Sequence, residues 1–198
     1  MLGSITPLGE RGRGSRWWLT TSAYVVGSIV GGAAMGALVG VLGTVAFISL
    51  GLGSRLLVLG VAIVAGLLLD AGAFGLRLPT VHRQVDEAWR TRYRGWVWGL
   101  GFGLQLGTGV VTIVTTSLVY ATWLAGALTA DVPAAVAIGL VFGLARALPV
   151  FGVARVHRSD QLLRVDAVLA RLAEPSRRIA VAAGSAVACV ALVGAVRW

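Results

Sequence analysis

Lysine is absent from this 198-residue chain, cysteine occurs once, and there are only eight acidic residues. The single cysteine, Cys189, excludes a disulfide, a dithiol redox pair or a cysteine-based metal cluster within one chain. Charged residues make up 13% of the chain against 57% hydrophobic residues, and the mean hydropathy is +0.86. A soluble domain of this size needs more polar surface than this composition supplies. The composition therefore indicates a protein surrounded largely by lipid.

The residue patterns that mark common enzyme classes are also missing. No Ser/His/Asp set, phosphate-binding glycine loop or pair of catalytic carboxylates stands out in the sequence. The two histidines, His82 and His157, lack carboxylate or cysteine neighbours at the spacing of metal ligands. We therefore expect no catalytic, cofactor-binding or metal-binding residues, no cofactor and no enzymatic activity.

Uncharged stretches long enough to cross a bilayer alternate with clusters of arginine. A spanning helix needs about 20 apolar residues, and five stretches meet this requirement: 19–49, 56–76, 96–129, 133–152 and 178–196. The expected fold is an all-α, polytopic helical membrane protein. Similar Val-His-Arg triplets begin at Val81 and Val156, after the second and fourth spans, which indicates two pseudo-repeated hairpins and a final span.

The arginine clusters predict the orientation in the membrane. All 17 basic residues are arginines, and fourteen of them fall within 11–16, 77–94 and 155–178. Cytoplasmic loops of membrane proteins are enriched in basic residues. The expected organisation is therefore a cytoplasmic head over 1–18 and a single membrane domain over 19–198. Two cytoplasmic loops lie within that domain, at 77–95 and 153–177. Five spans then place the C-terminus outside. The arginine-only basic set and the abundance of Ala, Gly and Val suggest a GC-rich bacterial genome, so the expected location is the inner membrane of a bacterium.

The net charge of +9 is the feature that would suit nucleic acid. Cytoplasmic arginine loops already account for this charge, and no basic-aromatic binding motif accompanies it. The expected partner is therefore the lipid bilayer, and nucleic acid is excluded.

Both predicted cytoplasmic loops have the pattern of amphipathic helices. Within 79–96, apolar and aromatic residues share one face, while arginines and acidic residues share the other. In the second loop, Asp160 is the expected N-cap and Pro175 the expected end of the helix. We expect both helices to lie on the inner leaflet, and docking onto a partner protein is the alternative.

Small residues line one face of the first span. They recur at intervals of three or four, and this spacing lets helix backbones approach closely in membranes. The residues of this face are Ser28, Gly32, Gly36, Gly40 and Gly43. The pattern predicts that the face packs against another helix rather than lipid, and it is compatible with a homodimer or a partner membrane protein.

The third span is too long for a single straight helix across the bilayer. Its 34 residues would measure about 50 Å against a hydrocarbon core of about 30 Å. A break or kink is therefore predicted at Gly107 or Gly109, and Pro149 marks a second such point in the fourth span. Four polar residues share one helical face here: Gln105, Thr108, Thr112 and Thr116. They either stabilise helix packing or line a polar cavity beside the break.

Asp70 and Arg146 are the two charged residues expected inside the membrane. Such charges are costly in lipid, at about 2.5–3.5 kcal/mol on insertion scales, and they usually find partners or water. Each precedes a Val-His-Arg triplet by a similar distance. We therefore expect the two side chains to lie at similar depth and to pair, with proton or anion handling as the functional alternative.

Two glycine-rich stretches and the first span carry a family resemblance. The stretches are Gly99–Gly109, GLGFGLQLGTG, and Gly139–Phe151, GLVFGLARALPVF. Together with Arg16–Gly43 they resemble the transmembrane domain of the cytochrome c biogenesis and DsbD-type thiol-disulfide reductant conduits. The second stretch is similar to a span of that family that closes in Leu-Pro-Phe, and the first to the approach to its second active-site Pro-Cys. The resemblance implies two hairpins around a central cavity.

The sequence departs from that family where its chemistry takes place. By this resemblance the chain would lack the family's first span, with its own Pro-Cys, and Thr108-Gly109 or their neighbours stand where a second cysteine would be expected. Thiol exchange requires a thiolate and a disulfide, and Cys189 alone cannot supply that cycle. The redox activity is therefore not expected here.

Two functional hypotheses remain open. The first is a small-solute carrier or transporter that uses the polar stripe of the third span and the pair of intramembrane charges. The second is a non-catalytic membrane subunit or scaffold that supports a redox, cytochrome-maturation or other membrane complex.

Overall fold

The structure is a computed structural model that describes residues 5–12, 14–73, 94–110 and 116–198. Every regular element among these residues is helical, which confirms the all-α prediction. The elements are α1 (Pro7–Gly12), α2 (Trp17–Phe47), α3 (Leu52–Asp70), α5 (Gly95–Thr108), α6 (Leu118–Leu128), α7 (Val132–Ala147), η2 (Leu148–Val153) and α8 (Ser159–Arg197). Among the described residues, four segments are long and apolar enough to cross a membrane: α2, α3, Val132–Val153 and Asp160–Arg197.

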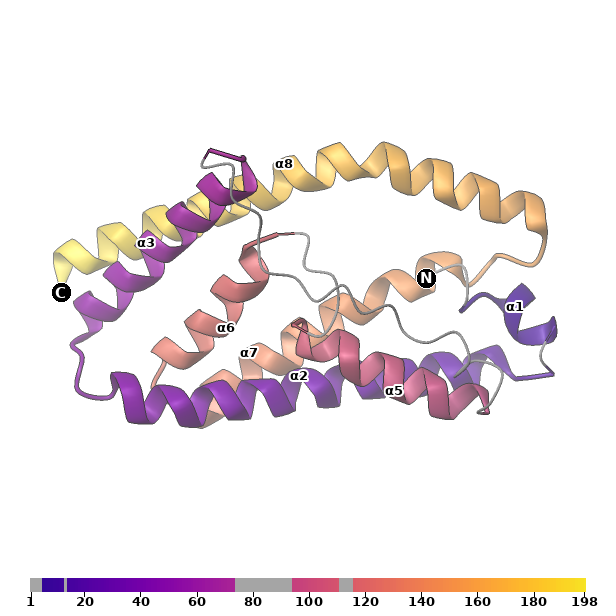
Figure 1. Cartoon of the computed structure of the whole chain (residues 1–198), viewed down its shortest axis with the longest axis horizontal. Coiled ribbons are helices and arrows are strands. Elements are labelled where there is room, and N and C mark those ends of the chain that lie inside the picture. The colour runs from indigo at the N-terminus through magenta and orange to yellow at the C-terminus, as the bar shows by residue number, and fades with distance from the viewer. Residues whose placement is uncertain (1–4, 13, 74–93, 111–115) are drawn as a thin grey trace.

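Helix α2 is the centre of a bundle that it forms with α5 and α7 (Figure 1). The small-residue face of α2 meets α7, where a Cβ atom at Gly32 would collide with the carbonyl oxygen of Gly139. The hydroxyl of Ser28 donates a hydrogen bond of 2.7 Å to the carbonyl oxygen of Gly143. Gly36 and Gly40 also face α7, and Gly43 faces Ala127 of α6. The face is covered within the chain, so a homodimer could not use it without displacing α7.

Helices α3 and α8 form a second unit (Figure 1). After the turn that follows Phe47, α3 diverges from α2 and packs along the C-terminal half of α8. Gly60 of α3 lies against the side chain of Leu192, and Gly184 of α8 lies against that of Leu67. Helix α6 stands between this α3–α8 pair and the bundle, and it contacts both α2 and α3.

The third predicted span, 96–129, consists of two helices rather than one. Helix α5 ends at Thr108, and Gly109 caps it with φ 73°, a left-handed conformation that glycine adopts without steric cost. Helix α6 begins at Leu118. Gly107 lies within α5 and packs against the carbonyl oxygen of Ser28, so the chain leaves the helix at Gly109.

Two expectations about the remaining helices need correction, and a third concerns Pro149. Pro175 does not end the loop helix, because α8 continues through it to Arg197. The residues on both sides are mostly strong helix formers, and proline removes only one hydrogen bond from such a helix. Asp160 is not the N-cap, because Arg158 takes that position and α8 begins at Ser159. The Gln161 side chain accepts hydrogen bonds from the N–H groups of the two residues before α8, at 2.7 and 3.2 Å. Pro149 lies in η2, where α7 tightens into a 3-10 helix.

The head of the chain folds onto the start of α2. The indole N–H of Trp17 donates to the carbonyl oxygen of Ile5 at 2.9 Å, and Ile5 is buried. Glu10 is fully buried, and its carboxylate accepts a hydrogen bond of 2.8 Å from the hydroxyl of Thr20. The predicted amphipathic helix over 79–96 falls almost entirely outside the described residues.

Candidate functional site

Asp70 is the last residue of α3, and its half-buried carboxylate receives hydrogen bonds from the start of α6. The Thr116 hydroxyl donates to Asp70 Oδ2 at 2.9 Å. The Ser117 hydroxyl donates to the same oxygen at 2.9 Å. The Ser117 N–H is shared between Oδ2, at 2.9 Å, and Oδ1, at 3.1 Å. The structure thus joins two sequence predictions, the intramembrane carboxylate and the last residue of the polar stripe.

These contacts follow from the break in the third span. A helix that starts inside apolar surroundings exposes backbone N–H groups that lack partners within the helix, and it carries a partial positive charge at that end. Ser117 makes no side-chain capping bond of its own, and Asp70 accepts from its N–H instead. Gly66 makes the approach feasible, because a Cβ atom there would lie 2.6 Å from the Ser117 hydroxyl oxygen.

Arg55 forms the corresponding contact at the other end of α6. Its guanidinium donates to the carbonyl oxygen of Thr129 at 3.2 Å, just after α6 ends. It also donates to Leu50 at 2.9 Å and Ile48 at 3.0 Å, both in the turn after α2. The ends of two helices, where the partial charge is negative, therefore share one cation. Helix α6 is held by an anion at its start and a cation at its end, and both come from α3.

A cavity of about 550 Å³ opens beside Asp70, between α3, the start of α6 and the middle of α8. Its walls are mostly apolar, with polar groups from Asp70, Thr116, Ser176 and Arg177. The remaining lining residues are Leu67, Ala71, Ala173, Ala180 and Val181. Charge of both signs therefore borders one largely apolar space.

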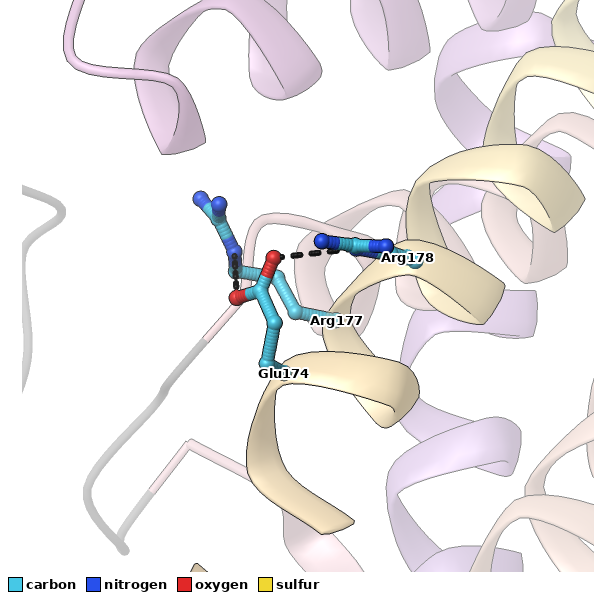
Figure 2. Close-up of polar contacts among 3 residues, drawn as sticks. All are labelled: Glu174, Arg177 and Arg178. Carbon is cyan, nitrogen blue, oxygen red and sulfur yellow. Dashed lines mark hydrogen bonds and ion pairs between the residues drawn. The ribbon is translucent and has the colours of Figure 1, made fainter. Parts of the chain in front are cut away.

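Arg177 is held at the edge of this cavity by an exposed carboxylate (Figure 2). Its Nε donates to Glu174 at 3.2 Å, and the Nε of Arg178 donates to the other carboxylate oxygen at 3.1 Å. Glu174 stands one turn before both arginines on α8. The three side chains form one exposed cluster.

Arg146 lies in the last turn of α7, half-buried and against aromatic rings of the bundle. Its guanidinium carbon stands 5.5 Å from the centre of the Phe142 ring, a cation–π geometry. Tyr24 of α2 is close enough to interact with it electrostatically, and Tyr24 stacks on Phe102 with ring centres 5.6 Å apart. The partners that the structure gives Asp70 are Thr116 and Ser117, so pairing of Asp70 with Arg146 stays a prediction.

The predicted polar stripe is divided by the break. Gln105 is half-buried on α5, and the Thr108 hydroxyl donates to its backbone carbonyl at 2.8 Å, within the same helix. Thr112 falls outside the described residues. Thr116 lies at the start of α6, bonded to Asp70. The stripe assumed one continuous helix, whereas its described members belong to α5 and to the start of α6, so their lining of one cavity stays a prediction.

Sequence reasoning missed two residues that the structure places at polar contacts, Ser117 and Glu10. Ser117 donates to Asp70 through both its N–H and its hydroxyl, and the only signal in the sequence was its place after two threonines. Glu10 is buried at the base of α2 beside Gly95, the first residue of α5, where an added Cβ would lie 2.9 Å from its carboxylate. A single acidic residue in a basic head gives little warning of burial.

Comparison with known proteins finds relatives of this sequence. The chain is similar to MauF proteins. The methylamine utilization protein MauF of Paracoccus versutus is 39% identical over 158 residues, which cover 74% of this chain and 56% of the relative. MauF of Paracoccus denitrificans is 39% identical over 155 residues, covering 74% and 54%. MauF of Methylophilus methylotrophus is 29% identical over 151 residues, covering 75% and 53%.

The chain spans a little over half the length of these relatives. No protein-family model and no solved structure matches it. The comparisons therefore do not support the resemblance to the cytochrome c biogenesis and DsbD-type family. The structure gives the motifs that suggested it a different reason, because Gly99, Gly103 and Gly107 and also Gly139 and Gly143 all pack against the backbone of α2. Close helix packing alone produces that glycine spacing.

Proposed function

We propose that this chain is a non-catalytic membrane accessory protein of a methylamine utilization system, where it supports the maturation or assembly of a partner protein. The observation that carries the proposal is the similarity to MauF proteins, 39% identical over about three-quarters of the chain. The regular elements of the described residues are all helical and include four long apolar segments, which suits a subunit embedded in the bilayer. The partner would be another component of the same system.

Deleting the gene in the organism that carries it tests this proposal. Growth with methylamine as the carbon source should be lost, and growth on an unrelated carbon source should continue at the normal rate. A plasmid copy should restore growth on methylamine, and an affinity-tagged copy should retain a partner from detergent-solubilised membranes. Normal growth of the deletion strain on methylamine would rule the proposal out.

A small-solute carrier is the second candidate, favoured by the cavity between Asp70 and Arg177 beside a broken helix. Discontinuous helices border the substrate sites of many transporters. Purified protein in lipid vesicles should then take up radiolabelled methylammonium, and Asp70→Asn should abolish uptake. Asp131→Asn is a matched control, because this exposed carboxylate also caps a helix, accepting from the Ala134 N–H at 3.2 Å. No uptake above that of empty vesicles favours the accessory role.

A further inference from the structure

The α3–α8 pair is attached to the rest of the protein by different contacts at the two ends of α3. At one end, Arg55 binds three backbone carbonyl oxygens, at 2.9, 3.0 and 3.2 Å, in the turn after α2 and at the end of α6. Backbone carbonyls next to helix ends cannot rotate away as side chains do. This end is also where the chain passes from α2 into α3. The Arg55 end therefore suits a fixed pivot.

At the other end, α3 stops at Asp70 and is held by a small number of polar contacts. These are the bonds to the hydroxyls of Thr116 and Ser117 and to one backbone N–H. Two of the three donors are side chains that can rotate. The adjoining space between α3, α6 and α8 is the cavity of about 550 Å³ rather than packed side chains.

Helix α8 supplies a flexible point beside that cavity. Its first turns are attached to the bundle, since Leu162 and Val165 pack against the buried cluster that includes Tyr24 and Trp98. Its C-terminal half follows α3. Pro175 lies between these two parts, and Figure 1 shows α8 changing direction along its length. Proline inside a helix leaves one carbonyl without its bond and is a usual place for bending.

We propose that α3 and the part of α8 after Pro175 swing as one unit about the Arg55 end. The Asp70 contacts to Thr116 and Ser117 act as a latch that holds the unit closed. Opening the latch separates the end of α3 from the start of α6 and widens the cavity. Because α3 has 19 residues and is therefore about 28 Å long, a rotation of about 10° moves its Asp70 end by about 5 Å.

Distances between nitroxide labels in lipid nanodiscs test this motion in the full chain. With Cys189→Ala as background, one pair joins Leu68 of α3, two residues before Asp70, to Leu144 of α7 in the bundle. The other joins Leu57 of α3 to Val41 of α2, near the pivot. All four positions are exposed. Asp70→Asn should lengthen the first distance by about 5 Å and broaden it, with the second unchanged, because only the latch is weakened.

Further variants keep the test decisive. Ser117→Ala replaces Asp70→Asn as the test if the latter does not fold. It removes one hydroxyl donor and leaves the carboxylate in place, so it should lengthen the first distance by a smaller amount. Adding Pro175→Ala to Asp70→Asn should reverse part of the lengthening by stiffening α8. Asp131→Asn should alter neither distance. The proposal is overturned if folded Asp70→Asn keeps the original first distance, or if both distances broaden together.

Discussion

The bundle around α2 and the pair of helices α3 and α8 are both built from apolar helices that contain glycine. The glycines of the two units contact different groups. In the bundle, a Cβ atom at Gly32 would strike the carbonyl oxygen of Gly139, and one at Gly107 would strike that of Ser28. In the α3–α8 pair, a Cβ atom at Gly60 would lie 2.7 Å from the Leu192 side chain. At these positions backbone meets backbone in the first unit and side chain in the second, where Gly184 likewise lies against the Leu67 side chain. Gly53, next to the Arg55 end of α3, is the exception in the second unit, because it lies against the backbone of Ala195 and Trp198.

This difference separates a rigid unit from an adjustable one. Two backbones in contact cannot move apart without loss of their dispersion contacts, or together without collision. A leucine side chain can change rotamer and keep most of its contacts. The bundle is therefore suited to be a rigid unit, and the α3–α8 pair is suited to small movements against it.

The largest expected effect comes from adding one methyl group to each unit. Gly32→Ala should destabilise the protein by about 1–3 kcal/mol or more, because the α2 and α7 backbones must separate. Gly60→Ala should cost less, since its new methyl group would meet Cγ and Cδ2 of Leu192, a side chain that can change rotamer. Thermal unfolding in detergent, followed by circular dichroism, measures both.

Gly51→Ala is the control for the change of residue alone. No atom lies within 4 Å of a Cβ at that position, and its φ of −63° suits alanine. The contrast between the two units breaks down if Gly60→Ala lowers the unfolding temperature as much as Gly32→Ala does.

The sequence predicted those features that one helix carries by itself. The packing face of α2 follows from its spacing of small residues, and the left-handed Gly109 lies where the excess length of the third span required a break. Asp70 could be singled out because a carboxylate in an apolar helix needs a partner.

The partners themselves depend on how the helices pair, which the sequence does not contain. The repeat suggested that hairpins form between consecutive spans, whereas α3 packs on α8, more than 100 residues further along the chain. Asp70 therefore meets Ser117, which carries no pattern of its own, and Thr116 bonds across helices instead of along a stripe. Burial of Glu10 depends in the same way on α5 reaching the head.

An intermediate effect is expected from the hydrogen bond that crosses the bundle. Ser28→Ala removes the donor to the Gly143 carbonyl and leaves the glycine contacts in place. Hydrogen bonds between membrane helices contribute about 0.6 kcal/mol on average, so the loss should be well below that of Gly32→Ala. Ser185→Ala, at an exposed position of α8, is the control in the same unfolding measurement. Equal losses for Ser28→Ala and Gly32→Ala would mean that polar bonds, not backbone contacts, hold the bundle.

The smallest effect is expected near the middle of α8, just before Pro175. Glu174 is bonded to Arg177 and Arg178, and the three side chains are 52%, 66% and 79% exposed (Figure 2). Exposed ion pairs contribute little because water solvates both partners and salt screens them. Glu174→Gln should therefore leave the unfolding temperature unchanged at low and high salt. A clear loss at low salt only would show that this cluster helps to fix α8 beside the cavity, and the adjustable unit would then begin after Arg178 instead of at Pro175.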